Sequence, residues 1–270
     1  MPYMSAEDGI PLYYTDQGRG DSILLIHGWT MNHKFFRHNI PELSRTHRVV
    51  TMDIRGHGYS GKQDLNLNLR QAARDTRRII DYLDLGEVTL VGWSMGTTLI
   101  LNYLDQFGGE KLKAAVFIEM TPYLVNEGGW EHGVFGTLDH KAAHGLQRDI
   151  FENRLVVEES FIPTFFRGGK VPDEETKEWW IRETMLTPTG VVVAFWISMV
   201  AQDWREQLPQ IPVPVLLCYG TESILYPTKI RDYMRENIPE SSLVEFEESG
   251  HSPPWEEPEK FNAEITRFVG

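Results

Sequence analysis

Cysteine is almost absent from this chain. Cys218 is the only one among 270 residues, so no disulfide can form within the chain. Such a composition fits a reducing compartment. The opening residues, MPYMSAEDGI, also lack the basic and then apolar pattern of a secretory signal. We therefore expect a cytoplasmic protein in which Cys218 is a buried, inert thiol.

Long apolar runs and an excess of positive charge are missing as well. The most apolar stretch, VVVAFWISMV at 191–200, is much shorter than the ~18 residues of a membrane span. The 39 acidic residues outnumber the 26 basic ones, and a net charge of −13 repels nucleic acid and anionic lipid. We expect no nucleic-acid or membrane partner, a small neutral or apolar ligand, and a monomer or homodimer.

Strand and helix patterns alternate in both halves of the chain. Residues 2–18 predict a hairpin with its turn at Asp8-Gly9. Further strands and helices follow in alternation, with strands at 22–28, 48–53, 87–92, 113–120, 214–220 and 242–249 and helices at 69–85, 97–107 and 256–269. This order is typical of an α/β protein with a mostly parallel twisted sheet flanked by helices.

The alternation stops between residues 121 and 209. This block has short helical patterns, no clear strand and many aromatic residues, namely Trp130, Phe135, Phe151, Phe161, Phe165, Phe166, Trp179, Trp180, Phe195, Trp196 and Trp204. We predict that 1–120 and 210–270 form the core, and that 121–209 is a helical cap inserted into it. A cap rich in aromatic residues favours an apolar binding pocket, although packing within the cap explains part of the list.

A serine lies at one strand-to-helix junction. The segment VTLVGWSMGTTLI places Ser94 between Gly92 and Gly96, after a β-branched strand and before an apolar helix. On such a sharp turn the serine hydroxyl projects from the end of the sheet, and the glycines allow strand and helix to pack closely. This arrangement predicts a nucleophile, although a junction that merely needs glycines has the same pattern.

A serine hydroxyl needs a base to take its proton, and His251 is the candidate. It follows the last strand in SGHSPPWEEPEKF, where Gly250 permits a tight turn. The segment HGW ends an earlier strand, and the backbone N–H groups of Trp29 and Met95 are candidates for an oxyanion hole. His27 in the same segment is expected to pin the loop.

A metal site is a weaker alternative. His140 and His144 in HKAAH have the spacing of two zinc ligands on a helix, but Lys141 stands where a metalloprotease has its glutamate. We predict no metal and no cofactor.

The motifs HGW, DIRGHGYSG, GWSMG and SGHSPPWEEPEKF, in this order, resemble those of the α/β-hydrolase superfamily, and most closely its cofactor-free haloperoxidase and esterase-like branch. The resemblance implies the α/β-hydrolase fold, a helical lid and a triad of nucleophile, acid and histidine in that chain order. Dehalogenases in this superfamily use an aspartate nucleophile followed by tryptophan. Here Ser94 is followed by Met95, so acyl transfer to water is expected.

The acid of the triad is not where the resemblance implies it. Members usually carry it three residues beyond the glycine that ends the strand VLLCYG, and that position is Ser223. Glu222 is adjacent, but neighbouring side chains on an extended turn point in different directions. In many haloalkane dehalogenases the acid follows the preceding strand, and VFIEMTP is similar, which implicates Glu119. We prefer Glu119, with Glu222 and a purely structural Glu119 as alternatives.

These residues predict a serine hydrolase for a carboxylic ester or lactone with an apolar acyl or aryl group, acting through an acyl-enzyme intermediate. The alternative is a ligand-sensing protein of the same fold with slow or no turnover.

Overall fold

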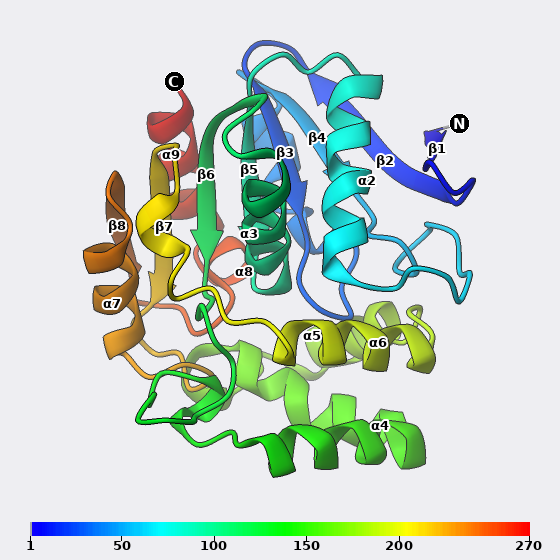
Figure 1. Cartoon of the computed structure of the whole chain (residues 1–270), viewed down its shortest axis with the longest axis vertical. Helices are drawn as coiled ribbons and strands as arrows, with labels where there is room; N and C mark the ends of the chain where they lie inside the picture. Colours follow the sequence, from blue (N-terminus) through cyan, green and yellow to red (C-terminus); the bar gives the residue numbers. More distant parts are fainter. Residues whose placement is uncertain (1) are drawn as a thin grey trace.

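An eight-stranded sheet runs through the part of the chain that the computed structural model describes, residues 2–270 (Figure 1). Its order is β1-β2-β4-β3-β5-β6-β7-β8. The strands are β1 (Tyr3–Ser5), β2 (Pro11–Gly18), β3 (Ser22–Ile26), β4 (Arg48–Met52), β5 (Val88–Trp93), β6 (Leu112–Ile118), β7 (Val215–Gly220) and β8 (Ser241–Phe246). The pairs β1/β2 and β2/β4 are antiparallel, and all other neighbouring strands are parallel. The predicted mostly parallel α/β fold is therefore confirmed.

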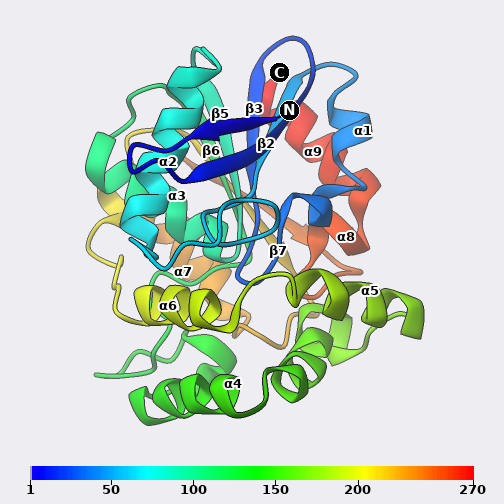
Figure 2. The same cartoon turned by 90° about the vertical axis from the view of Figure 1, so that its right-hand side faces the viewer.

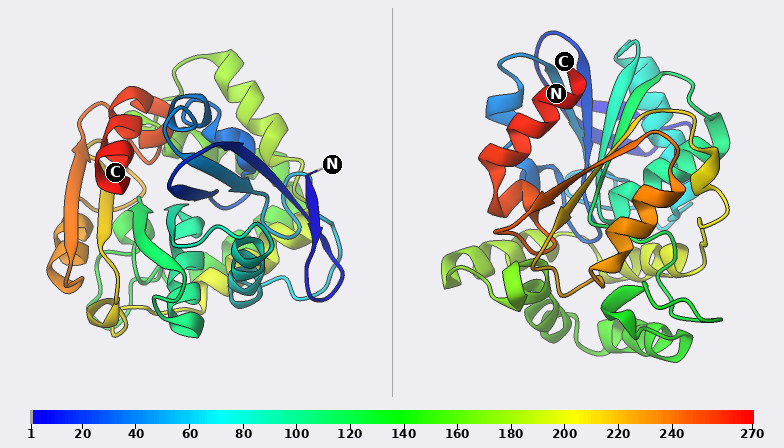
Figure 3. Two further views of the ribbon diagram at one scale, coloured as in Figure 1. Left: turned by 90° about the horizontal axis from the view of Figure 1, so that it is seen from above. Right: turned by 90° about the vertical axis from the view of Figure 1, so that its left-hand side faces the viewer.

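Helices cover both faces of the sheet. Figures 2 and 3 show α1 (Ile40–Leu43), α8 (Pro253–Glu256) and α9 (Pro258–Val269) on one face, and α2 (Leu69–Tyr82), α3 (Met95–Phe107) and α7 (Lys229–Asn237) on the other. Nearly all side chains of the central strands β3 and β5 are apolar, and both strands are buried along their whole length.

The helix α2 illustrates how sequence pattern becomes packing. Its inner face consists of small and aliphatic residues at helical spacing, and the side chain of Asn68 caps its first turn by accepting from Gln71 N at 2.9 Å. Asp75 on the same helix forms a buried ion pair with Arg55, which follows β4. The helix is thereby joined to the loop that carries DIRGHGYSG.

Between β6 and β7 the chain forms a layer of helices. It contains η2 (Val134–Gly136), α4 (His140–Phe161), η3 (Ile162–Phe165), η4 (Arg167–Gly169), α5 (Glu174–Thr184), α6 (Thr189–Val200) and η5 (Leu208–Gln210). Its only β-pairing among the described residues is an isolated bridge between Tyr123 and Asp203. Figure 1 places α4, α5 and α6 beyond the carboxyl ends of the parallel strands, which is the edge where open α/β sheets bind ligands.

Polar contacts hold this layer against the sheet. Glu183 of α5 accepts from Asn32 Nδ2 at 3.1 Å and pairs with Lys34 Nζ at 3.0 Å, while Ser198 Oγ of α6 accepts from Leu69 N at 3.0 Å. Because Glu183 and Asn32 are buried, these contacts are shielded from solvent.

Of the helices described between residues 2 and 270, none is by itself long and apolar enough to cross a membrane. By length and composition alone α5 and α6 together would suffice, but they are bent by 89° at the break between them.

Candidate active site

Ser94 occupies a strained turn between β5 and α3. Its φ of 54° and ψ of −117° lie in a region that residues with a Cβ rarely adopt, at a cost of about 1–3 kcal/mol. Two hydrogen bonds of 2.8 Å hold the turn, from Ser94 N to Ile118 O and from Thr97 N to Ser94 O. The neighbouring strand β6 thus fixes the backbone that presents the serine.

The two glycines of GWSMG are required by close packing. A Cβ at Gly92 would lie 2.5 Å from the carbonyl carbon of Gly96, and a Cβ at Gly96 would collide with the carbonyl oxygen of Ile26. Both contacts are with backbone, which cannot rotate away. Strand and helix therefore cross at a separation that only glycine permits.

We expect Gly92→Ala to lower the free energy of unfolding by about 1–3 kcal/mol, because the added methyl group overpacks a rigid junction. The matched control is Gly145→Ala in α4, where nothing lies within 4 Å of the added Cβ. That variant should be as stable as the parent or about 0.5–1 kcal/mol more stable, since alanine is the better helix former. Urea unfolding measures both. Equal stability of Gly92→Ala and the parent would contradict the packing argument.

His251 and Glu119 are paired in the interior. His251 Nδ1 lies 3.2 Å from Glu119 Oε2, and both side chains are almost completely buried. Glu119 follows β6 with a φ of 47°, so its backbone also lies in the left-handed region. Its Oε1 accepts from Gly220 N at 2.8 Å, and its Oε2 accepts from Ser223 Oγ at 2.9 Å. The residue at the usual acid position therefore donates a hydrogen bond to a carboxylate from the preceding strand.

Glu222, the alternative acid, points elsewhere. Its side chain is exposed, whereas its backbone N–H donates to Ser249 O at 3.1 Å and its carbonyl accepts from Gly168 N at 3.0 Å. The turn is thus held by main-chain bonds that leave the Glu222 carboxylate in solvent. The structure brings Glu119 to His251 and does not bring Glu222.

The His251 loop is braced by a glutamate. Glu256 accepts from Gly250 N at 2.8 Å and from Arg167 N of η4 at 2.7 Å, so it ties the histidine loop to the helical layer. Burial raises the pKa of Glu256 to about 7, against the lowering effect of those two backbone N–H groups. The other ring nitrogen of His251, Nε2, is buried and has no hydrogen-bond partner among residues 2–270.

The backbone N–H groups of Trp29 and Met95 have no acceptor within the described part of the chain. Both residues are buried, and Met95 N–H is at the first turn of α3, where backbone N–H groups have no partner inside the helix. His27 fixes the loop before Trp29, since its Nδ1 lies 2.8 Å from Gly28 O and its Nε2 accepts from Ile54 N at 3.0 Å. Burial lowers the pKa of His27 to about 4, so its ring is neutral.

Ser94 opens into an apolar cavity of about 30 Å³. Apart from Ser94 and Tyr226 its walls are nonpolar or indole side chains, contributed by Trp29, Met120, Leu124, Val134, Phe161, Phe165, Trp196, Met199 and Leu225. Of the aromatic residues between 121 and 209, only Phe161, Phe165 and Trp196 reach it. Many of the rest pack on the core, as Trp179 does on Trp255 with ring centroids 5.0 Å apart.

Tyr226 is a residue of this site that sequence reasoning missed. It is buried, lines the cavity beside Ser94, and its ring centroid lies 5.5 Å from that of His251. An aromatic residue following the turn GTES was the available signal. In the sequence alone, Tyr226 is indistinguishable from an ordinary core residue. Its place beside Ser94 depends on the fold of the turn.

Sequence comparison identifies the family of this chain. A sequence model of the α/β hydrolase fold family matches residues 21–258. The chain belongs to this family. It is 27% identical to a putative non-heme chloroperoxidase from Synechocystis sp., with 100% of both chains covered. It is also 27% identical to a pimeloyl-[acyl-carrier protein] methyl ester esterase from Aliivibrio salmonicida, covering 96% of this chain and 95% of that one.

A solved structure with the same fold is closely similar to this α/β hydrolase. The esterase from Exiguobacterium antarcticum superposes with a TM-score of 0.92 and 28% identity, covering 99% of this chain and 98% of that one. The resemblance to the haloperoxidase and esterase-like branch is therefore confirmed.

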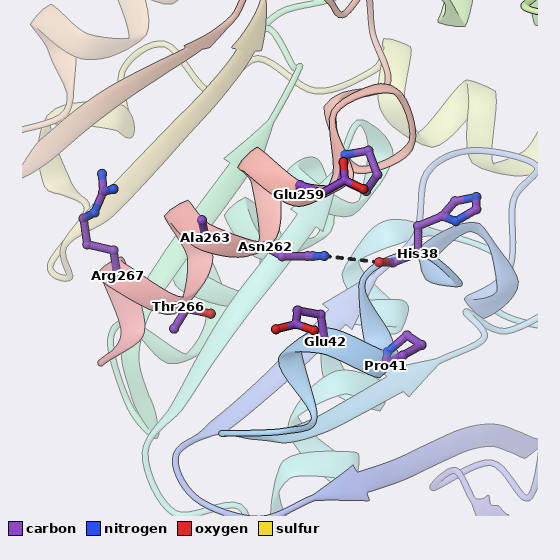
Figure 4. A pocket seen from close by; sticks show the side chains of 9 residues that line it. His38, Pro41, Glu42, Glu259, Asn262, Ala263, Thr266 and Arg267 are labelled. Carbon is purple, nitrogen blue, oxygen red and sulfur yellow. Dashed lines mark hydrogen bonds between the residues drawn. The ribbon is translucent and has the colours of Figure 1, made fainter.

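A hollow larger than the cavity at Ser94 lies elsewhere on this α/β hydrolase. A groove of about 750 Å³ lies between α1 and α9, where Asn262 Nδ2 donates to His38 O at 3.2 Å (Figure 4). It shares no lining residue with the cavity at Ser94. We take the smaller cavity as the candidate active site because Ser94 lines it, and because two of its other lining residues, Phe165 and Tyr226, have ring centroids 5.2 and 5.5 Å from that of His251.

The HKAAH segment lies on α4, at the surface. His140 Nε2 is 2.9 Å from Glu127 Oε2, an exposed pair. Within residues 2–270, no group of three His, Cys, Asp or Glu side chains is arranged to hold a metal ion. Cys218 is buried in β7, and burial raises the pKa of its thiol.

Proposed function

We propose that this α/β hydrolase is a serine hydrolase that cleaves a carboxylic ester or lactone through an acyl-enzyme intermediate. Ser94 is the nucleophile, His251 the general base and Glu119 the acid. The observation that carries this proposal is the buried pair of His251 Nδ1 and Glu119 Oε2, 3.2 Å apart. Phe165 and Tyr226, which line the cavity together with Ser94, have their rings beside that of His251. A carboxylate on Nδ1 fixes the tautomer in which Nε2 accepts a proton.

In the first half of the reaction Ser94 Oγ attacks the ester carbonyl carbon while His251 Nε2 takes the hydroxyl proton. The carbonyl oxygen becomes an oxyanion, to which the N–H groups of Trp29 and Met95 donate. His251 then returns the proton to the alcohol oxygen, and the C–O bond breaks. The acyl group remains on Ser94, and a lactone substrate would keep its alcohol on the same molecule.

In the second half a water molecule replaces the alcohol. His251 Nε2 takes a proton from the water, whose oxygen attacks the acyl carbon. The bond to Ser94 Oγ breaks as His251 donates the proton back to it, and a carboxylic acid leaves. The carboxylate of Glu119 stabilises the imidazolium that forms in each half.

The apolar cavity favours a neutral substrate. No lysine or arginine lines it, so a carboxylate group on the substrate would lose its hydration without a partner. Its volume of about 30 Å³ has room for only about two water molecules. A short acyl group therefore fits with small side-chain movements, whereas a longer one needs displacement of residues 121–209. We propose that these residues are a cap on a core formed by 1–120 and 210–270.

Chromogenic aryl esters of graded acyl length test this function. We expect p-nitrophenyl acetate to be hydrolysed with a kcat/KM at least about 100-fold above that of the anionic succinate monoester, because burying an unpaired carboxylate costs several kcal/mol. The Ser94→Ala variant gives the background rate. Tight binding of neutral esters without turnover would contradict the hydrolase proposal and indicate a ligand-sensing protein.

A further inference from the structure

Glu256 connects the loop of His251 to the helical layer with both of its carboxylate oxygens. Its Oε2 accepts from Gly250 N at 2.8 Å, and its Oε1 accepts from Arg167 N of η4 at 2.7 Å. A carboxylate accepts equally well at both oxygens, whereas an amide or a protonated carboxyl group carries hydrogen on one of the two sides. Facing two N–H groups, Glu256 therefore makes both bonds at full strength only when it is ionised.

The loop at Gly250 is packed between two backbone segments. A Cβ at Gly250 would lie 2.5 Å from the carbonyl carbon of Phe166, and a Cβ at Gly220 would collide with the carbonyl oxygen of Gly250. The end of β7 thus lies on one side of the loop, and the residues that lead into η4 lie on the other. The position of the loop therefore depends on where this part of the helical layer lies.

The reacting nitrogen of His251 depends on the loop for its position. The ring makes one polar contact, from Nδ1 to Glu119 Oε2 at 3.2 Å, and its Nε2 has no hydrogen-bond partner within residues 2–270. Gly250 directly precedes His251, so a shift of the backbone at Gly250 moves the ring. A misplacement of about 1 Å between reacting groups can lower a rate by about 100-fold.

We propose that Glu256 is a positioning residue for the general base, and that it holds His251 in reach of Ser94 only as a carboxylate, with one oxygen on the histidine loop and the other on the helical layer. This inference rests on the proposed hydrolase function. Because the same imidazole serves both halves of the reaction, acylation and deacylation should depend on Glu256 alike. A parallel change in the two rates lowers kcat and leaves KM as it was.

The surroundings of Glu256 place its ionisation in the range where the enzyme can be assayed. Burial raises its pKa to about 7, against the lowering effect of the two backbone N–H groups, and the charge of Glu119 adds a smaller raising effect. The guanidinium of Arg167 pairs with Glu248. The further titratable groups on the elements around Glu256 are His251 and Glu257. Lowering the pH through 7 should therefore protonate Glu256 and weaken one of its two bonds.

The experiment is the hydrolysis of p-nitrophenyl acetate by Glu256→Gln in the full chain, with Ser94→Ala as the blank. At about pH 8.5 we expect kcat to fall about tenfold and KM to stay within about twofold, because glutamine turns its NH₂ group toward one of the two N–H donors. At about pH 5.5 the kcat values of parent and variant should agree within about twofold, because Glu256 of the parent is then protonated too. A merely structural defect would persist at both pH values.

The matched control is Glu257→Gln. Glu257 also binds this loop, but with a single oxygen, because its Oε2 accepts both from Glu248 N at 2.9 Å and from Ser249 Oγ at 2.6 Å. The carbonyl oxygen of a glutamine can take over both bonds. This variant should keep kcat within about twofold of the parent at both pH values.

An unchanged kcat of Glu256→Gln at the higher pH would overturn the proposal. So would an equal loss at both pH values, a loss confined to KM, or an equal loss in Glu257→Gln. Should Glu256→Gln fail to fold, the parent provides the test, because its kcat should follow two ionisations over this pH range, those of His251 and Glu256, and a profile with one ionisation would overturn the proposal. A folded parent without ester turnover, and with Ser94 unlabelled by a fluorophosphonate, would instead refute the hydrolase function itself.

Discussion

Replacing Ser94 by alanine should lower kcat for a neutral aryl ester by on the order of 10⁶, because a triad acts as a unit and loses nearly all its effect with the nucleophile. Alanine keeps the Cβ and therefore the strained backbone at φ 54°. The thermal unfolding midpoint should hardly change. Steady-state kinetics beside a thermal melt measure the two effects separately.

Ser252→Ala is the matched control for this variant. Ser252 is buried next to His251, yet its hydroxyl has no hydrogen-bond partner within residues 2–270. Its removal should leave kcat within about threefold of the parent, since no interaction is lost. Fluorophosphonate labelling followed by peptide mapping provides a second check, and modification of a peptide without Ser94 would exclude Ser94 as the nucleophile.

Glu119→Gln should lower kcat by about 10⁴, because the serine, the histidine and the oxyanion donors remain while the imidazole loses the charge that orients it. Glutamine keeps the size of the side chain. Its amide group, however, cannot accept from Gly220 N, Ser223 Oγ and His251 Nδ1 together as the carboxylate does. We therefore also expect the free energy of unfolding to fall by about 1–3 kcal/mol, measurable by urea unfolding.

Glu222→Gln is the decisive comparison. The side chain of Glu222 is exposed on the turn that also carries Ser223, so removal of its charge should keep kcat within about tenfold of the parent. A severe loss in Glu222→Gln with a mild one in Glu119→Gln would assign the acid to the turn after β7. If neither variant is impaired, His251 is oriented by some other group, and a ligand-sensing role becomes the better explanation.

The turn that carries Ser94 and the loop that carries His251 could both be predicted from local features of the sequence. Ser94 stands between a strand and a helix with glycines on both sides, and the conformation of such a turn depends on residues within a few positions. The position of His251 after the last strand is similarly local. The alternation of strands and helices determined the fold, because burial on both faces of a parallel sheet leaves continuous apolar runs that can be read directly.

Only the tertiary structure decided which carboxylate meets the histidine. Glu119 and His251 are 132 residues apart, and their contact depends on β6 and β7 being neighbours in the sheet and on Ser223 donating into the same carboxylate. The same holds for Tyr226 and for the aromatic residues that line the cavity. Sequence periodicity indicates which side of an element is buried. It does not indicate which partner from a distant segment lies opposite, because that depends on how all the elements pack together.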